Sequence, residues 1–241
     1  MENVMGILKI SGLTKRYKKF TAVQDVTFEV PEGAVYGLVG LNGAGKTTTI
    51  KSITGLLKKF DGDISIAGLP WGHKDYNKEF SFLPELFTPP LYLTGMEYVK
   101  FILELHKAKV DMDLVNRMCD TLNFDKNLLD KKTKTYSKGT MQKIGLIQAV
   151  CTPAKLLILD EPMSGLDPLA RARFKNLIAD VNQKGTTLFL STHILHDIDT
   201  LCSHIGILNA GRLLFNGTPA ELKQKYNVTN LEDAFLKEIG A

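Results

Sequence analysis

Hydrophobic positions along this chain follow two alternating patterns. Short, nearly continuous apolar runs such as Leu156–Leu159 are typical of strands buried on both faces of a parallel sheet. Longer stretches with helical periodicity lie between them. This alternation is what a mostly parallel α/β sheet requires. The predicted strands are Ile7–Ser11, Ala22–Val30, Val35–Val39, Asp63–Ile66, Leu156–Leu159, Thr187–Leu190 and Ile205–Leu208.

The middle of the chain departs from this alternation. Several prolines between residues 84 and 90 interrupt regular structure, and Thr94 then caps a helix with Glu97 in the capping-box position. From there onward helical patterns replace strands, so we interpret the stretch from about 84 to 149 as an insertion in an α/β core. The predicted helices of the whole chain are Thr47–Leu57, Gly95–Ala108, Asp113–Leu122, Ser137–Cys151, Pro168–Gln183 and Leu195–Leu201.

Length and composition suit one globular domain with a subdomain. The chain has 241 residues, of which 44% are hydrophobic, and it can bury its own core. No apolar run approaches the roughly 18 residues of a membrane span, and the N-terminal segment lacks the layout of a signal peptide. We therefore expect a soluble, cytoplasmic chain.

Cysteine spacing and charge argue against several kinds of site. Cys119, Cys151 and Cys202 are odd in number and far apart, so neither a disulfide framework nor a zinc site is indicated. His193 and His196 could share a helix face as metal ligands, but no partner at a recognisable spacing supports this. The net charge of +4 is mild and its lysines are dispersed, so we expect no direct nucleic-acid partner.

The most specific chemical motif follows the predicted strand Val35–Val39. Residues 40–48 fit G-x-x-x-x-G-K-[ST], a phosphate-binding loop whose glycines let successive N–H groups point into one concavity. Lys46 can reach the β and γ phosphates, and Thr47 can offer its hydroxyl to Mg²⁺. The predicted nucleotide-binding residues of this loop are Gly40, Leu41, Asn42, Gly43, Ala44, Gly45, Lys46, Thr47 and Thr48.

Two carboxylates follow the buried run Leu156–Leu159, at the strand end where open α/β sheets bind ligands. Asp160 can bind Mg²⁺ directly or through water, and Glu161 can accept a proton from the water that attacks the γ phosphate. Alone, such a pair is commonly a helix cap. Together with a phosphate loop, it predicts hydrolysis of a nucleoside triphosphate.

In this order, the motifs resemble those of the ATP-binding cassette (ABC) ATPases over nearly the whole chain. The segment Tyr136, Ser137, Lys138, Gly139, Thr140 resembles the family signature LSGGQ and retains its serine and second glycine. In isolation it would be a serine-capped helix, and only the order of the motifs favours the signature. The resemblance implies a head-to-tail dimer in which each signature covers the ATP bound by the opposite subunit.

The resemblance also implies a domain layout. It predicts an α/β fold: a P-loop NTPase core with an N-terminal antiparallel β subdomain and an inserted helical subdomain. A single nucleotide-binding domain would span residues 1–241, with its core at about 1–83 and 150–225. The helical subdomain would cover about 84–149, and a C-terminal helix about 230–240.

Further positions match motifs of the family. The segment from Ser164 to Asp167 resembles the loop that communicates across the dimer. His193 resembles the switch histidine that contacts the γ phosphate and helps to position the attacking water. Tyr17 lies where the family stacks an aromatic ring on adenine, with Phe20 as the competing candidate.

One position departs from the common family pattern. Where most cassettes have a glutamine, the segment Phe80–Glu85 ends in an acidic residue. An ionised Glu85 accepts hydrogen bonds but cannot donate them, so it could serve Mg²⁺ or water and lose a contact donated to a partner. The alternative is that Glu85 caps a surface loop. This substitution is similar to that of cassettes serving exporters of drugs, peptides or other hydrophobic compounds, including bacteriocin-immunity systems.

The resemblance therefore implies an ATPase subunit of a membrane exporter, with ATP and Mg²⁺ as cofactors. Its partners would be a second cassette and a transmembrane permease, which would hold it peripherally on the cytoplasmic face of the membrane. A non-transport ABC ATPase acting on DNA, ribosomes or cofactor assembly is the alternative. Such proteins usually carry tandem cassettes, long heptad insertions or zinc cysteines, which are absent from this sequence. A third class, a regulatory module without turnover, is disfavoured by Glu161 and His193.

Overall fold

A mostly parallel sheet forms the centre of the molecule. The computed structural model describes residues 6–164 and 166–240. Within them, six strands lie in the order β10-β9-β3-β8-β7-β6, and all neighbours are parallel except the antiparallel pair β10 and β9. The strands are β3 (Val35–Val39), β6 (Phe80–Leu83), β7 (Leu156–Asp160), β8 (Thr187–Thr192), β9 (His204–Asn209) and β10 (Arg212–Gly217).

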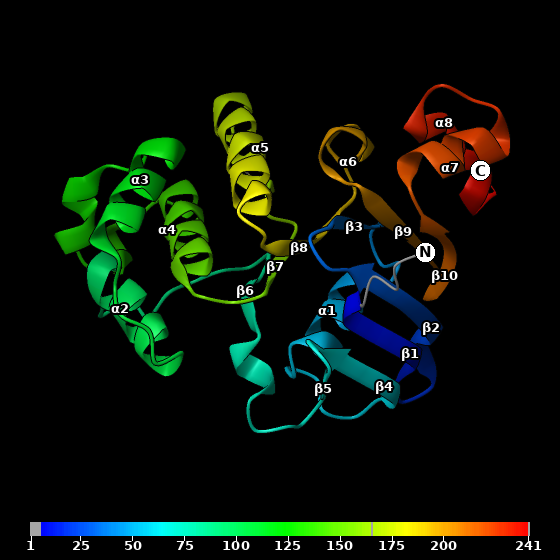
Figure 1. The fold of residues 1–241 in the computed structure, drawn as a ribbon, viewed down its shortest axis with the longest axis horizontal. Helices are drawn as coiled ribbons and strands as arrows, with labels where there is room; N and C mark the ends of the chain where they lie inside the picture. The colour runs from blue at the N-terminus through cyan, green and yellow to red at the C-terminus, as the bar shows by residue number, and fades with distance from the viewer. Residues whose placement is uncertain (1–5, 165, 241) are drawn as a thin grey trace.

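A second, antiparallel sheet forms the N-terminal subdomain. Its strands lie in the order β2-β1-β4-β5. They are β1 (Gly6–Tyr17), β2 (Phe20–Pro31), β4 (Asp61–Ile66) and β5 (Leu69–Pro70). Figure 1 shows β1, β2 and β4 together at the lower right, away from the helices of the insertion.

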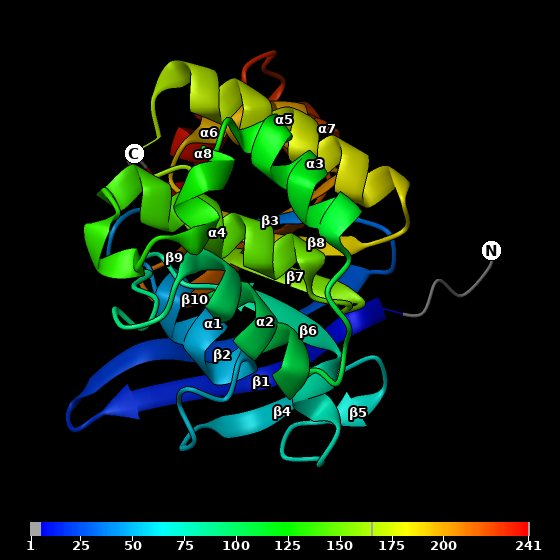
Figure 2. The ribbon, with the colours of Figure 1, turned by 90° about the vertical axis from the view of Figure 1, so that its left-hand side faces the viewer.

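The helices fall into three groups (Figures 1 and 2). Helix α1 (Lys46–Ile53) is the next element after β3. Three helices gather on one side as the helical insertion, namely α2 (Gly95–Leu105), α3 (Met112–Leu122) and α4 (Lys138–Cys151). The remaining helices are α5 (Pro168–Gln183), α6 (Leu195–Leu201), α7 (Pro219–Tyr226) and α8 (Leu231–Ile239), and the short 3₁₀ helices are Tyr76–Lys78, Lys126–Asp130 and Thr133–Thr135.

The central sheet is buried on both faces, because successive side chains of its strands enter different cores. In β3, Val35 and Val39 pack in a core shared with the helices, whereas Tyr36 and Leu38 pack in a core shared with the antiparallel sheet. In the second core the rings of Phe28, Tyr36 and Phe189 pack against one another, with all three pairs of centroids between 5.3 and 5.9 Å apart.

The structure confirms the predicted α/β fold, with an antiparallel N-terminal sheet and an inserted helical region. Strand β3 and helices α5 and α6 have the predicted bounds. The prediction that the first helix reaches Leu57 was wrong: α1 ends at Ile53, because Gly55 takes a left-handed conformation with φ of 75°. The hydrophobic pattern of the sequence did not predict β5, β10 or α7. Of these, β5 and β10 are short and partly exposed.

The strand order explains how distant segments meet. Strands β3, β8 and β7 are neighbours, and the segments that follow their carboxyl ends carry Lys46, His193 and Glu161 respectively. Since carboxyl ends of parallel strands share one edge of a sheet, these three side chains converge there.

Candidate functional site

The phosphate-binding loop lies between β3 and α1, and its glycines are needed where they stand. Gly43 and Gly45 have φ of 82° and 109°, which non-glycine residues rarely adopt. A Cβ at Gly40 would lie 2.3 Å from the carbonyl oxygen of Leu208, so the loop approaches β9 more closely than a side chain permits. The loop thus has a backbone suited to presenting N–H groups to an anion at the start of α1.

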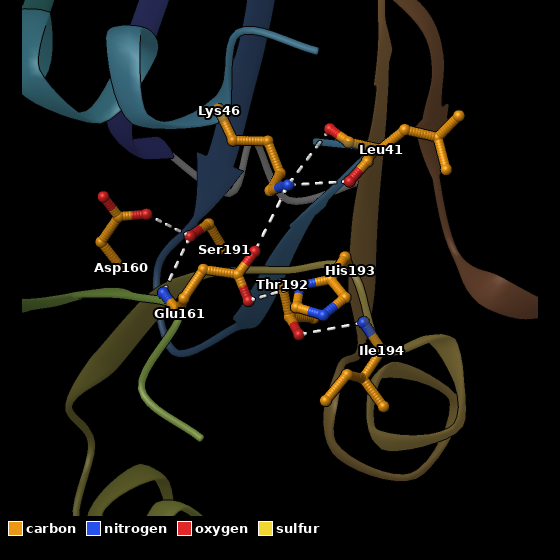
Figure 3. Close-up of polar contacts among 9 residues, drawn as sticks. Leu41, Lys46, Asp160, Glu161, Ser191, Thr192, His193 and Ile194 are labelled. Carbon is orange, nitrogen blue, oxygen red and sulfur yellow. Dashed lines mark hydrogen bonds and ion pairs between the residues drawn. The ribbon is translucent and has the colours of Figure 1, made fainter. Parts of the chain in front are cut away.

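Lys46 is buried. Figure 3 shows its ammonium between Leu41 and Glu161. Its Nζ donates hydrogen bonds to the carbonyl oxygens of Gly40 (2.7 Å) and Leu41 (3.4 Å). The same Nζ lies 3.3 Å from Oε1 of Glu161. The ammonium therefore lies where the loop faces the carboxylate that follows β7.

Glu161 connects three elements. Its other carboxylate oxygen, Oε2, lies 3.0 Å from Nδ1 of His193, which follows β8. Its backbone N–H donates to Oγ of Ser191 at 3.0 Å, and its φ of 47° is unusual for a residue with a side chain. These contacts hold the carboxylate between Lys46 and His193.

Asp160 is almost completely buried at the end of β7. The Ser191 hydroxyl donates a hydrogen bond of 2.5 Å to its Oδ1. Burial raises the pKa of the Asp160 carboxyl, and the nearby Glu161 carboxylate adds to this rise. Hydrogen bonds from Ser191 and Thr47 and the charge of Lys46 act against it.

The donor set around Asp160 fits a cation that completes its coordination with ligand oxygens. The Asp160 carboxylate and the nearby Thr47 hydroxyl are both hard oxygen donors suited to Mg²⁺. The part of the chain that the structure describes contains no cluster of three or more His, Cys, Asp or Glu side chains that could hold a metal. Mg²⁺ is usually bound through one or two protein ligands together with phosphates and water, and Asp160 with Thr47 would supply such a pair.

A cleft of about 540 Å³ brings most of the predicted site together. Tyr17 and Phe20, which face each other across the β1–β2 hairpin, both line it, so geometry alone does not separate the two candidates for adenine stacking. Glu85, on the exposed segment after β6, also reaches the cleft. The lining residues are Tyr17, Phe20, Ala22, Asn42, Gly43, Ala44, Gly45, Lys46, Thr47, Thr48, Glu85, Glu161 and His193.

The predicted signature segment does not line this cleft. Tyr136 is buried in the helical insertion, where its hydroxyl donates to the carbonyl of Leu128. Ser137 caps α4 by accepting a hydrogen bond from the Thr140 N–H at 3.2 Å, and Lys138 beside it is exposed. The segment therefore presents a helix N-terminus to solvent, as the Ser137 cap predicted.

The predicted communication loop also lies outside the cleft. The Ser164 N–H donates to the carbonyl of Glu161 at 3.0 Å. Asp167 caps α5 by accepting from the Ala170 N–H at 2.9 Å. Gly165, which lies between them, is outside the described residues. The loop is thus tied at one end to the residue after β7 and at the other to α5.

Comparison with known proteins identifies the family. Residues 23–164 match the family model described as ABC transporter. The lantibiotic transport ATP-binding protein SrtF of Streptococcus pyogenes is 34% identical over 239 residues, which cover 97% of each chain. The chain belongs to the ABC transporter family.

Other similar proteins agree with this assignment. A solved structure of an ATP-binding subunit of an ABC transporter has a TM-score of 0.88 and 30% identity, with 96% of this chain and 99% of that one covered. An uncharacterised ABC transporter ATP-binding protein of Synechocystis, sll0415, is 34% identical over 85% of this chain, which spans 59% of its length. The chain is thus an ABC ATPase that binds ATP.

One buried residue of this ABC cassette was missed by the sequence predictions. Ser191 is completely buried in β8 and bonds both Asp160 and the backbone of Glu161. The available signal was a polar pair, Ser191 and Thr192, at the end of an otherwise apolar strand.

Within residues 6–164 and 166–240, no helix combines the length and apolar character needed to cross a bilayer.

Proposed function

We propose that this cassette powers the export of a peptide, drug or other hydrophobic compound, as one of two ATPase subunits beneath a separate membrane permease. The observation that carries the proposal is the convergence of Lys46, Glu161 and His193 at one edge of the sheet, with separations of 3.3 and 3.0 Å. Export is supported by the similarity to SrtF, whose name states lantibiotic transport. The acidic residue at position 85 supports the same class of exporter.

ATP binding would use the two ends of the cleft. The N–H groups of residues 42–48 would surround the phosphates, while an aromatic ring of the β1–β2 hairpin, assigned to Tyr17, stacks on adenine. Lys46 would exchange its carbonyl and Glu161 partners for the β and γ phosphate oxygens. That exchange would free the Glu161 carboxylate for its part in hydrolysis.

Thr47, Asp160 and Glu85 would hold Mg²⁺ with the phosphates. The bound cation would neutralise charge on the phosphate oxygens. Asp160 is suited to this role because its buried carboxylate gains a positive partner, and Ser191 orients it through the 2.5 Å hydrogen bond.

Glu161 would act as the general base. Its carboxylate accepts a proton from the water whose oxygen attacks the γ phosphorus, as the bond from phosphorus to the ADP oxygen breaks. His193 would position this water and donate to the γ phosphate, and its 3.0 Å contact with Glu161 supports a joint role of the two side chains.

The dimer would complete the site. Ser137 is exposed and Gly139 is half-buried at the start of α4, and a Cβ built at Gly139 meets nothing within 4 Å among the described residues. A glycine in a helix costs about 1 kcal/mol relative to alanine, so an unfilled space there points to use by something outside the chain. We assign it to the ATP of the opposite cassette, with Tyr136, Lys138 and Thr140 as the rest of the signature.

The permease would dock beside Glu85. Large apolar side chains are exposed on the segment after Glu85 and on α2, including Leu86 (84% exposed), Tyr92 (75%) and Leu105 (62%). Exposed large apolar side chains are common at protein interfaces. Glu85 reaches the nucleotide cleft from the same segment, and would therefore transmit the state of the nucleotide to the permease and attach the cassette to the membrane.

The export proposal is tested in the host cell. Deletion of the gene should increase sensitivity to hydrophobic and cationic peptide antibiotics, and the wild-type gene should restore resistance, whereas Lys46→Ala should not. Lys46→Ala protein must be present at the wild-type level, and calorimetry should show that it no longer binds ATP well. Unchanged sensitivity across the panel after deletion would count against export of these compounds.

The Glu85 assignment needs a separate test. Glu85→Gln keeps the side-chain length and one acceptor oxygen, so it should retain substantial ATPase activity with an altered Mg²⁺ dependence. Glu85→Ala should lose more. If Glu85 caps a loop, the two variants would instead differ little in turnover and would change the free energy of unfolding by about 1 kcal/mol. The measurement is ATPase activity against Mg²⁺ concentration, with and without the permease.

A further inference from the structure

Lys15 is a buried cation next to the nucleotide cleft. It lies on β1, two residues before Tyr17, and is only 7% exposed. No carboxylate lies within ion-pair distance of its ammonium among residues 6–164 and 166–240. Burial of an ammonium is costly unless other groups replace its water, so the partners of Lys15 matter.

Two uncharged groups replace that water. The Nζ donates a hydrogen bond to the carbonyl of Lys59, just before β4, and lies over the ring of Tyr17, 5.1 Å from its centroid. A cation over an aromatic face is attracted by the negative charge of the π system. This contact joins two residues of β1 at a point where its pairing with β2 is irregular.

This contact distinguishes Tyr17 from Phe20. The two residues are paired across the hairpin, and both line the cleft, with exposed fractions of 42% for Tyr17 and 65% for Phe20. Within the described residues, no aromatic ring or cation is recorded against the Phe20 ring. Tyr17 is therefore the ring whose position is fixed before a base arrives.

We propose that Lys15 is a positioning residue for the base of the nucleotide: its ammonium holds Tyr17 from one face so that the opposite face stacks on adenine. The cation draws electron density from the ring, which favours stacking on an electron-rich purine. The hydrogen bond to Lys59 ties this arrangement to the strand β4. The inference rests on the proposed adenine site.

The test compares ATP with a ligand that lacks the base. Calorimetry measures binding of ATP and of inorganic tripolyphosphate, with Mg²⁺ chelated so that ATP is not hydrolysed. Lys15→Met should weaken ATP affinity by about 3- to 30-fold, the range from an exposed to a desolvated cation–π contact, and leave tripolyphosphate affinity unchanged. Lys15→Arg should retain most of the ATP affinity. Lys19→Met, which removes an exposed charge from the same hairpin, is the matched control and should bind both ligands as wild type does.

A double variant shows whether Lys15 acts through Tyr17. Added to Tyr17→Ala, Lys15→Met should cause no further loss of ATP affinity. Two results would overturn the proposal. Lys15→Met could lower the affinity for ATP and for tripolyphosphate equally, or it could lower ATP affinity as much in the Tyr17→Ala background as in wild type. If Lys15→Met does not fold, Lys15→Gln carries the test, since it keeps a donor for the Lys59 carbonyl but no cation, and the same selective loss is expected.

The same data separate this inference from the adenine site itself. If Tyr17→Ala leaves ATP affinity unchanged while Phe20→Ala lowers it, the base stacks on Phe20 and both assignments are wrong. If Tyr17→Ala lowers ATP affinity but neither Lys15→Met nor Lys15→Gln does, the adenine site stands and the role of Lys15 is wrong.

Discussion

At the scale of single residues, Glu161 combines an unusual backbone with two charged neighbours. Its positive φ costs on the order of 1–3 kcal/mol for a residue with a side chain, and the bonds from its N–H to Ser191 help to keep it there. This backbone directs the carboxylate towards Lys46 and His193 (Figure 3). Strain of this kind is expected where the position of a reacting group matters more than stability.

Glu161→Gln separates binding from hydrolysis. Glutamine keeps the size and hydrogen bonding of the side chain but removes the proposed base, so ATP hydrolysis should fall by at least about 10²-fold. ATP should still bind, and the variant should accumulate as an ATP-bound dimer. Phosphate release and equilibrium binding are measured on the purified protein. Near-normal phosphate release would remove Glu161 from the role of base.

Asp160→Asn tests the cost of burying a carboxylate. Because burial raises the pKa of Asp160 in the folded state, its contribution to stability is most favourable at low pH and is lost as pH rises through the raised pKa. Asparagine stays neutral throughout. The melting temperature of the variant minus that of wild type should therefore increase between about pH 4 and 8, without nucleotide.

The control for this experiment is Asp167→Asn, which keeps a good N-cap on α5 and should change the melting temperature little. A difference in melting temperature that stays constant or decreases as the pH rises would contradict the argument. The same variant should lose Mg²⁺-dependent hydrolysis, since the carboxylate is the proposed metal ligand.

At the scale of elements, helix α4 contains two glycines with opposite surroundings. A Cβ at Gly145 would lie 2.6 Å from Cδ1 of Leu83 at the end of β6 and 2.8 Å from Cδ1 of Phe87. Gly139 near the start of the helix has open space instead. Gly145 thus lets α4 pack against the end of β6 and the segment that carries Glu85, whereas Gly139 has no packing function within the chain.

Alanine substitutions at Gly139 and Gly145 should therefore change the free energy of unfolding in opposite directions. Gly139→Ala should raise the free energy of unfolding by about 0.5–1 kcal/mol through helix propensity. Gly145→Ala gains the same propensity but overpacks the contact with Leu83 and Phe87, at a typical cost of about 1–3 kcal/mol, so it should be destabilising overall. Chemical denaturation of the two monomers measures both. Equal stabilisation by the two alanines would show that Leu83 and Phe87 move aside for the added methyl group at no cost, which would contradict the prediction.

At the scale of the whole molecule, one chain holds two separated parts of an ATP site. The phosphate loop and the cleft lie at the sheet edge, whereas the signature lies at the exposed start of α4 and does not line that cleft. A single chain therefore covers its nucleotide on one side, and the proposed dimer brings in the other.

Gly139→Asp probes this arrangement without disturbing the monomer. A carboxylate in the first turn of α4 suits the helix dipole and meets nothing within the chain, so monomer stability should not fall. Facing the phosphates of a partner's ATP, it should prevent dimer formation. In the Glu161→Gln background, light scattering with ATP should show a monomer, and ATP affinity of that monomer should match the parent. A stable ATP-bound dimer would place the signature elsewhere.

Local sequence patterns were sufficient to predict the features that depend only on residues close together along the chain. The phosphate loop, the acidic pair after a buried strand and the alternation of strands with helices all depend on residues within a few positions of each other. The exposed strand β10 has a weaker pattern, since alternate side chains are partly exposed, and it was not predicted.

The class of fold and the residue types of the ATP site follow from the amino-acid order alone, because backbone conformation and hydrophobic period are short-range properties. Which groups meet depends on the folded chain: Ser191 against Asp160, Glu161 between Lys46 and His193, and Lys15 over Tyr17 and against Lys59. Most of these contacts join residues that lie tens of positions or more apart along the chain. They depend on the order of strands in the sheets and on close packing between them, which no local pattern specifies.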